Sequence, residues 1–260
     1  MTTSLRAIAP EFLKLRHSTI VWVTFAAFAL GPVMGGLSLY LLGHAGDMGS
    51  SPLSEKAKLM NFSADWPSYV GLLTQIVGVG GVVVFGFVAS WLFGREYSDK
   101  TAKDLLALPA SRSSIINAKF IVYAVWCIAL VVANLLLGLV VGALMGLDNF
   151  DVSVITSTLT NYFITTVLVM LLGTPVSFMG IWGKGYLAPI GLVVLMLIVS
   201  QIVGAVGLGQ YFPWSVPGLH SGISAEMKAS LSAVSFGLVG LVAVLGYLAS
   251  HWWWNQADQN

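Results

Sequence analysis

The sequence predicts an all-α, polytopic membrane protein with six transmembrane helices, and three observations support that prediction. Hydrophobic residues make up 57% of the chain and charged residues only 9%, whereas a soluble domain typically carries about 25% charged residues. Six apolar runs have about the length of 20 residues that a membrane-spanning helix needs. The charged side chains fall between these runs or near their ends. We therefore expect residues 1–260 to form a single transmembrane domain.

Composition also limits the partners and the chemistry. The net charge is +1, so no general attraction to nucleic acid is expected. The single cysteine, Cys127, lies in an apolar run, can form no disulfide within the chain and is expected to serve packing. The first apolar run is longer than the core of a signal peptide and has no small-residue cleavage site after it, so no cleaved signal is expected.

Residues 1–18 are expected to form a helix that lies in the membrane interface. On a helical projection one side is apolar and carries Leu5, Ile8, Ala9, Phe12 and Leu15. Arg6, Glu11 and Lys14 lie elsewhere, where basic groups can meet lipid head groups. The alternative is an unstructured basic tail, because the apolar stripe is short.

The first span is predicted at 19–42, a run of 24 residues without a charge. Residues 43–67 form a polar outer loop, and the second span is predicted at 69–93. Small residues let helices approach closely in lipid. The second span is rich in them, with Gly71, Gly78, Gly80, Gly81 and Gly86.

A charged cytosolic loop follows at 94–119, and we expect it to hold one short amphipathic helix. Asp99 can cap this helix, and Pro109 stops it. Its apolar stripe consists of Ala102, Leu105, Leu106 and Leu108. Ser111 or Ser113 can cap the next helix. The alternative is an ordinary solvated charged loop.

The third span is predicted at 120–145. Gly138, Gly142 and Gly146 recur at every fourth residue, a spacing suited to helix packing. Asn134 lies within the span, and we expect its amide to face another helix rather than a substrate. A short acidic outer turn follows at 146–153.

The fourth span, predicted at 154–182, has a polar outer half. Seven of the eleven residues at positions 156–166 are threonine, serine or asparagine. Thr158, Asn161 and Thr165 share one helix face, and Tyr162 lies beside it. We interpret these four residues as part of a substrate path. Hydrogen bonding between helices explains the same pattern equally well.

The last third of the chain completes the membrane domain. A tight cytosolic turn at 183–185 leads to the fifth span at 187–206. Residues 207–229 are too apolar for an exposed loop and too broken by proline and glycine for a span, so outer re-entrant helices are expected. The sixth span, at 231–254, ends in three tryptophans, which indicate an aromatic belt at the interface.

The basic residues predict the orientation. With both termini in the cytosol, the cytosolic segments hold nine lysines and arginines and the outer segments three. This asymmetry agrees with the positive-inside rule. It places the loop at 94–119 in the cytosol and predicts a multi-pass protein of the bacterial cytoplasmic (inner) membrane.

The loop resembles the first cytoplasmic loop of permease subunits of type 2 ABC exporters, most closely the bacitracin-resistance and lantibiotic-immunity branch. The resemblance rests on Glu96, Thr101, Leu105, Leu106, Pro109, Ser111, Arg112 and Lys119. Many members of this family have glycine before the threonine, where this chain has Lys100. Re-entrant outer helices before the last span are a further feature of the family.

The resemblance implies a function and a set of partners. The loop would hold a coupling helix that docks on a pair of cytosolic ABC ATPase subunits, which bind ATP and magnesium. The coupling residues would be Glu96, Thr101, Leu105, Leu106, Leu108 and Arg112. A second permease, identical or related, would complete a dimer in the bilayer. The implied substrate is an antimicrobial peptide or another amphipathic molecule moved outward.

Other function classes lack the residues they need. The chain contains no GxxxxGK[ST] phosphate loop, so ATP hydrolysis and other enzymatic activity are not expected on it, and neither is a cofactor. No charged residue lies well inside a predicted span, which disfavours ion-coupled transport. The runner-up interpretation is a non-transporting sensor or anchor subunit for a cytosolic partner.

Overall fold

The computed structural model describes residues 10–15, 18–43, 65–101, 111–149, 151–222 and 229–256. This part of the chain is helical except for turns and an isolated bridge between Asp65 and Asp148. Six spans are long and apolar enough to cross a membrane. They are α2 (Thr19–Gly43), a second span of α4 (Trp66–Gln75), η1 (Ile76–Gly80) and α5 (Gly81–Ser98), then α7 (Arg112–Leu144), α8 (Val152–Trp182), α9 (Leu187–Ala205) and α12 (Ala233–Gln256). The predicted fold class is confirmed.

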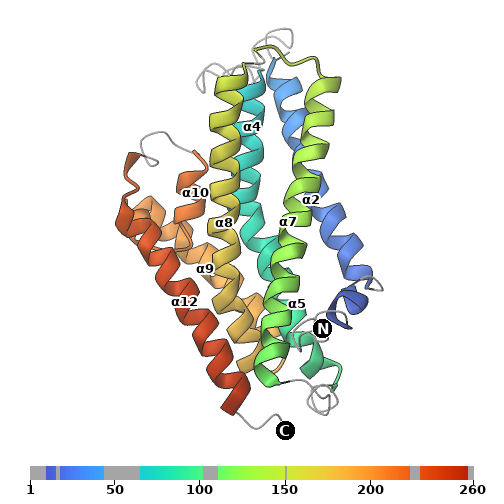
Figure 1. Ribbon diagram of the computed structural model, residues 1–260. Helices are drawn as coiled ribbons and strands as arrows, with labels where there is room; N and C mark the ends of the chain where they lie inside the picture. Colours follow the sequence, from blue (N-terminus) through green and yellow to red (C-terminus); the bar gives the residue numbers. More distant parts are fainter. Residues whose placement is uncertain are drawn as a thin grey trace.

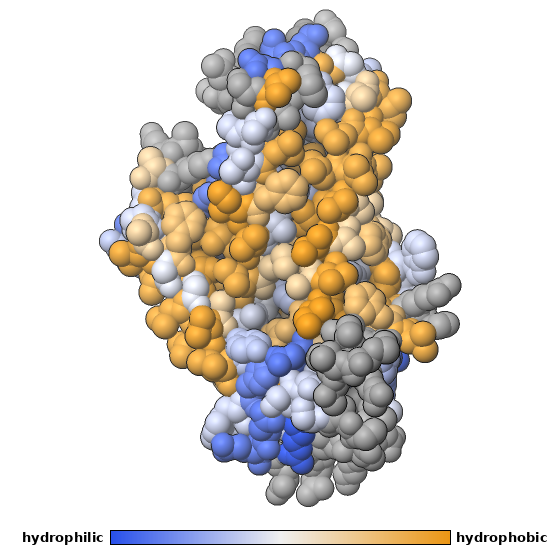
Figure 2. Space-filling model, in the orientation of Figure 1, coloured by the Kyte–Doolittle hydropathy of each residue, from blue (hydrophilic) through white to orange (hydrophobic). Residues whose placement is uncertain are grey.

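Helix α8 lies at the centre of the bundle. It packs against the second span and against α12, while α2 packs mainly on α7. The end of α5, the start of α7 and the end of α12 come together at one end of the molecule, called here the loop end (Figure 1). On the face shown in Figure 2, apolar residues cover the middle of the molecule and hydrophilic residues lie toward its two ends, as expected of a protein that crosses a bilayer.

The helices extend further into the predicted loop than its charge suggested. Helix α5 continues to Ser98 and α7 begins at Arg112, so both ends of the region 94–119 are helical. Ser111 caps α7 as predicted, with its hydroxyl 3.2 Å from the Ser114 amide. Asp99 is different: it ends α5, and its carboxylate accepts a hydrogen bond from Arg95 Nε at 3.0 Å.

Some glycines of the second span permit close approaches, as the sequence predicted, whereas a Cβ at Gly71 or Gly80 would meet nothing within 4 Å. A Cβ atom at Gly78 would lie 2.8 Å from the Pro217 carbonyl oxygen, and one at Gly94 would lie 2.7 Å from the backbone of Gly185. Side chains larger than hydrogen therefore cannot occupy these two contacts without moving the neighbouring backbone. The second span is fixed in this way against both the segment before the last span and the turn before α9.

Two prolines inside spans leave backbone carbonyls that other side chains satisfy. A proline has no N–H for the carbonyl four residues earlier. Pro32 frees the Phe28 carbonyl, which accepts from Asn134 Nδ2 at 2.9 Å. Pro175 frees the Leu171 carbonyl, which lies 3.0 Å from the Thr174 hydroxyl. Asn134 therefore joins α7 to α2, which confirms the helix-packing role predicted for it.

The segment before the last span contains two short helices, as the broken sequence predicted. They are η2 (Gly209–Tyr211) and α10 (Val216–His220), and α10 packs against α8 and η1. Residues 223–228 of this segment lie outside the described residues. The neighbouring η1 is a π-helical turn, a distortion that the sequence analysis did not predict.

The three tryptophans at the end of α12 have different environments. Trp252 is 57% exposed, as a residue of an aromatic belt should be, but Trp254 is 1% exposed. Its ring meets Tyr97 edge to face, with ring centroids 6.4 Å apart. Trp254 therefore packs inside the bundle against Tyr97 of α5 and does not belong to an exposed aromatic belt.

Candidate functional site

The candidate site lies at the loop end, where the second and third spans leave the bundle. Glu96, Thr101 and Arg112 are described there. Leu105, Leu106 and Leu108, the expected docking residues, lie outside the described residues, as do the rest of positions 102–110. The predicted coupling helix therefore remains a prediction, and the structure shows the base from which it extends.

Helix α5 ends in a Schellman motif directly before the loop. The Thr101 N–H bonds to the Glu96 carbonyl at 2.8 Å and the Lys100 N–H to the Tyr97 carbonyl at 3.2 Å. This geometry puts Lys100 in the left-handed region, with φ 58°, where glycine is favoured. The glycine common at this position in the resembling family therefore has a backbone explanation, and Lys100 carries strain there.

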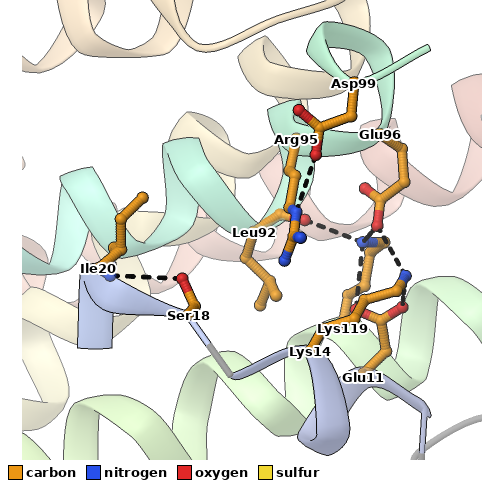
Figure 3. A network of polar contacts seen from close by, with 9 residues as sticks. All are labelled: Glu11, Lys14, Ser18, Ile20, Leu92, Arg95, Glu96, Asp99 and Lys119. Carbon is orange, nitrogen blue, oxygen red and sulfur yellow. Dashed lines mark hydrogen bonds and ion pairs between the residues drawn. The ribbon is translucent and has the colours of Figure 1, made fainter. Parts of the chain in front are cut away.

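Four charged side chains form a buried ion cluster at this base: Glu11, Lys14, Glu96 and Lys119 (Figure 3). Lys119 Nζ lies 2.7 Å from Glu96 Oε1 and 3.4 Å from Glu11 Oε2, and it also donates to the Leu92 carbonyl at 2.9 Å. Lys14 Nζ lies 2.7 Å from Glu11 Oε1 and 3.1 Å from Glu96 Oε1. The cluster joins the helix at residues 10–15 to α5 and α7.

Because the ion cluster is buried, each of its charged side chains depends on the others for stabilisation. Lys119, Glu11 and Glu96 are at most 3% exposed, so each needs its partners to offset the loss of hydration. Partial burial alone would lower the pKa of Lys14, but the carboxylates of Glu96 and Glu11 outweigh burial and raise that pKa above its ordinary value. Lys14 therefore stays charged across the physiological pH range.

The ion-pair partners of Glu96 are Lys119 and Lys14, a pairing that the sequence analysis did not predict. One sequence expectation about these charges was wrong. Glu11 and Lys14 were expected on the head-group side of an interfacial helix. Glu11 is buried instead, because it pairs with Lys119 at the base of the bundle.

Arg112 has a different role at the loop end. Its Nη1 donates to the Asn255 carbonyl at 3.2 Å, and Asn255 Nδ2 lies 3.2 Å from the Ser113 hydroxyl. These contacts join the first turn of α7 to the last turn of α12. The base of the loop is therefore held on two sides, by the ion cluster and by α12.

The expected substrate-path residues on α8 fall into two pairs. Tyr162 and Thr165 are both fully buried: the Tyr162 hydroxyl contacts the Val131 carbonyl at 3.0 Å, and the Thr165 hydroxyl lies 2.9 Å from His220 Nδ1. Their contacts fit the alternative of hydrogen bonding between helices. Thr158 and Asn161 are half-buried and remain the candidates for the path.

Sequence reasoning assigned no coupling role to Glu11, Lys14 or Lys119. The sequence did contain a signal for the ion cluster. Each of the three residues lies near the junction of a charged segment and an apolar run, and together with Glu96 their charges sum to zero. Sequence separation hid the pairing, because Glu11 and Lys119 are 108 positions apart. Among the described residues, no group of three or more His, Cys, Asp or Glu side chains could hold a metal ion.

Comparison with known proteins identifies relatives of this chain. The profile of the ABC-2 family transporter protein matches residues 7–200. The bacitracin transport permease protein of Bacillus licheniformis is 30% identical over 140 residues, which cover 54% of this chain and 67% of the relative. No solved structure matches the chain significantly.

Proposed function

We propose, from the premise that this chain belongs to the ABC-2 transporter family and is a membrane permease subunit of an ABC exporter, that it moves an amphipathic antibiotic outward. Membership of the family also makes it a multi-pass transport subunit that works with an ATPase. The substrate class is the proposed part. Its support is the similarity to a protein named as a bacitracin transport permease.

The structural observation that carries the coupling role is the clamp at the base of the loop. Glu96 precedes positions 102–110 and Lys119 follows them, and the charged groups of the two residues are 2.7 Å apart. A loop whose two ends are fixed to each other transmits a push to both spans together. Force applied by an ATPase to residues 102–110 would reach α5 and α7 through this pair.

The partners follow from the same proposal. Two ATPase subunits bind ATP and magnesium in the cytosol, and a second permease, identical or related, completes the complex in the bilayer. The coupling helix, with Leu105, Leu106 and Leu108, contacts the ATPase. Both termini are cytosolic, which is supported by the nine-to-three distribution of basic residues.

Co-purification of the chain with its ATPase tests the docking part. Leu105→Glu should release the ATPase, because a charge in the apolar contact would have to be desolvated. Lys184→Glu is the matched control, since it adds a carboxylate on the second cytosolic turn. Full ATPase yield and activity with Leu105→Glu would show that the helix does not dock.

Export is tested in a bacitracin-sensitive bacterium that expresses the complex. Cells with the intact complex should tolerate more bacitracin than cells whose ATPase carries a disabled phosphate loop. Glu96→Gln should lower stability, because buried Lys119 loses a carboxylate partner, and it should lower substrate-stimulated ATP hydrolysis in the complex that remains assembled. Equal sensitivity of all strains to a panel of amphipathic antibiotics would overturn the proposed substrate class.

A further inference from the structure

A cavity of about 270 Å³ lies between the second span, α9 and the segment before the last span. Gly78 and Val79 of η1 form one wall, Leu197 and Gln201 of α9 a second, and Trp214 a third. The residues that line it include neither members of the ion cluster nor the four expected path residues on α8. It is therefore a separate feature of the molecule.

The size and lining of the cavity indicate what it can hold. Its volume is far above the roughly 10–15 Å³ that one water needs and just below the about 300 Å³ at which whole-ligand pockets begin. Most of the lining is apolar, from valine, leucine, alanine and tryptophan. Such a space fits one hydrocarbon chain of a larger molecule, with the remainder left in the bilayer.

Gln201 places a hydrogen-bonding side chain at the edge of this apolar space. It and its neighbour Ser200 are the hydrogen-bonding side chains of an otherwise apolar α9. The Gln201 side chain is exposed and has no partner among the described residues. Gln201 lines the cavity with an amide that can both donate and accept a hydrogen bond, so a ligand with a hydrogen-bonding head group fits the cavity better than a pure hydrocarbon.

One wall of the cavity is mechanically linked to the loop end. Gly78 lies in the π-helical η1 and packs directly on the Pro217 carbonyl. Single π-helical turns are frequent at functional sites. The same span ends at Glu96 in the ion cluster, so a shift of the second span would change the cavity wall and the loop base together.

We infer that this cavity binds the hydrocarbon chain of the exported amphipathic molecule, with Gln201 hydrogen-bonding its head group and Trp214 packing on the chain. This inference rests on the proposed export function and adds a substrate class and a location to it. The ligand is an amphipath with a single chain in the cavity and a hydrogen-bonding head, such as an amide or a hydroxyl.

Photo-crosslinking of the whole permease–ATPase complex in lipid nanodiscs tests the inference. The probe is a dodecyl amide with a diazirine in its chain, and mass spectrometry maps the crosslinks. Gly204→Leu adds an apolar side chain at a lining residue of the cavity, at a position where a Cβ meets nothing within 4 Å. Gly191→Leu is the matched control on the same helix, also in open space but outside the cavity lining.

We expect crosslinks at Val79, Leu197 and Trp214, reduced at least fivefold by Gly204→Leu and unchanged by Gly191→Leu. Gln201→Leu should abolish the preference for the amide over a dodecane probe. ATP with vanadate should change the crosslink yield, since a transported molecule leaves its site during the cycle.

Other results would overturn the inference. Equal yields in the two leucine variants would show that the cavity is not occupied. Equal labelling by a diazirine phosphatidylcholine, independent of ATP, would identify a resident lipid instead. An intact, ATP-hydrolysing complex without these crosslinks refutes only the cavity, whereas failure to assemble with any ATPase refutes the proposed function.

Discussion

At the scale of single residues, the loop base contains two lysines with opposite effects on stability, one stabilising and one strained. Lys119 is fully buried and satisfied by two carboxylates and a backbone carbonyl. Lys100 is exposed and strained, with φ 58°. Removal of the first side chain should destabilise the protein, and replacement of the second should stabilise it.

Lys119→Met should lower the free energy of unfolding by about 3–5 kcal/mol, because Glu11 and Glu96 would stay buried with Lys14 as their only remaining cation in the cluster. Unfolding in a denaturing detergent measures the change. Arg112→Met, at an exposed site, should cost about 0–1 kcal/mol. Addition of Glu11→Gln to Lys119→Met should recover part of the loss, and an unchanged midpoint in the single variant would refute the dependence.

Lys100→Gly should raise the stability of the loop base by about 1 kcal/mol, since glycine adopts the left-handed conformation without strain. Thermal unfolding of the purified chain measures the effect. Ser98→Gly, two residues earlier and within α5, should act in the opposite direction because glycine disfavours helix. If Lys100→Gly and Ser98→Gly lower stability equally, the strain at position 100 is refuted.

At the scale of the elements, hydropathy predicted all six spans, because length and apolar content dominate in a membrane. The predicted ends were least accurate beside the charged loop, where α5 continues to Ser98 and α7 begins at Arg112. Ser111 was predictable as a cap because its hydroxyl bonds to a backbone amide three residues later, within the same helix. The partners of Glu96 were not predictable, since they come from helices far apart in the sequence. The π-helical turn at Ile76–Gly80 packs against α10, a contact that no local pattern of the second span reveals.

The contact between α2 and α7 gives a prediction at this scale. Asn134→Leu should cost about 1–3 kcal/mol, because the Phe28 carbonyl that Pro32 leaves free would lose its donor. Pro32→Ala restores a backbone N–H four residues after Phe28, so Asn134→Leu should cost less in that background. A double-mutant cycle on unfolding free energies measures the difference. Equal costs in both backgrounds would show that the amide does not serve this carbonyl.

At the scale of the whole molecule, the polar half of α8 belongs partly to the interior of the bundle and partly to its surface. Tyr162 and Thr165 contact α7 and the segment before the last span, whereas Thr158 and Asn161 are half-buried. The sequence could place all four on one region of the helix. It could not separate them, because the separation depends on where His220 and α7 lie.

Thiol accessibility tests this division. In a Cys127→Ser background, Thr158→Cys and Asn161→Cys should react with a water-soluble thiol reagent in at least one state of the transport cycle. Thr165→Cys should stay unreactive, because its position is fully buried. Mass spectrometry of the labelled chain gives the extent of reaction. No reaction at 158 and 161 in any state would remove α8 from the path.

The ion cluster contains two carboxylates and two ammonium groups, so its charges cancel. A transmembrane potential of 100 mV does about 2.3 kcal/mol of work on one elementary charge that crosses the membrane, but none on a neutral group moved as a unit. A shift of this whole cluster along the membrane normal during ATP hydrolysis is therefore electrically silent. ATP hydrolysis by the complex in proteoliposomes should proceed at the same rate with and without a potassium diffusion potential, whereas Lys119→Met, with an uncancelled negative charge, should make the rate voltage-dependent.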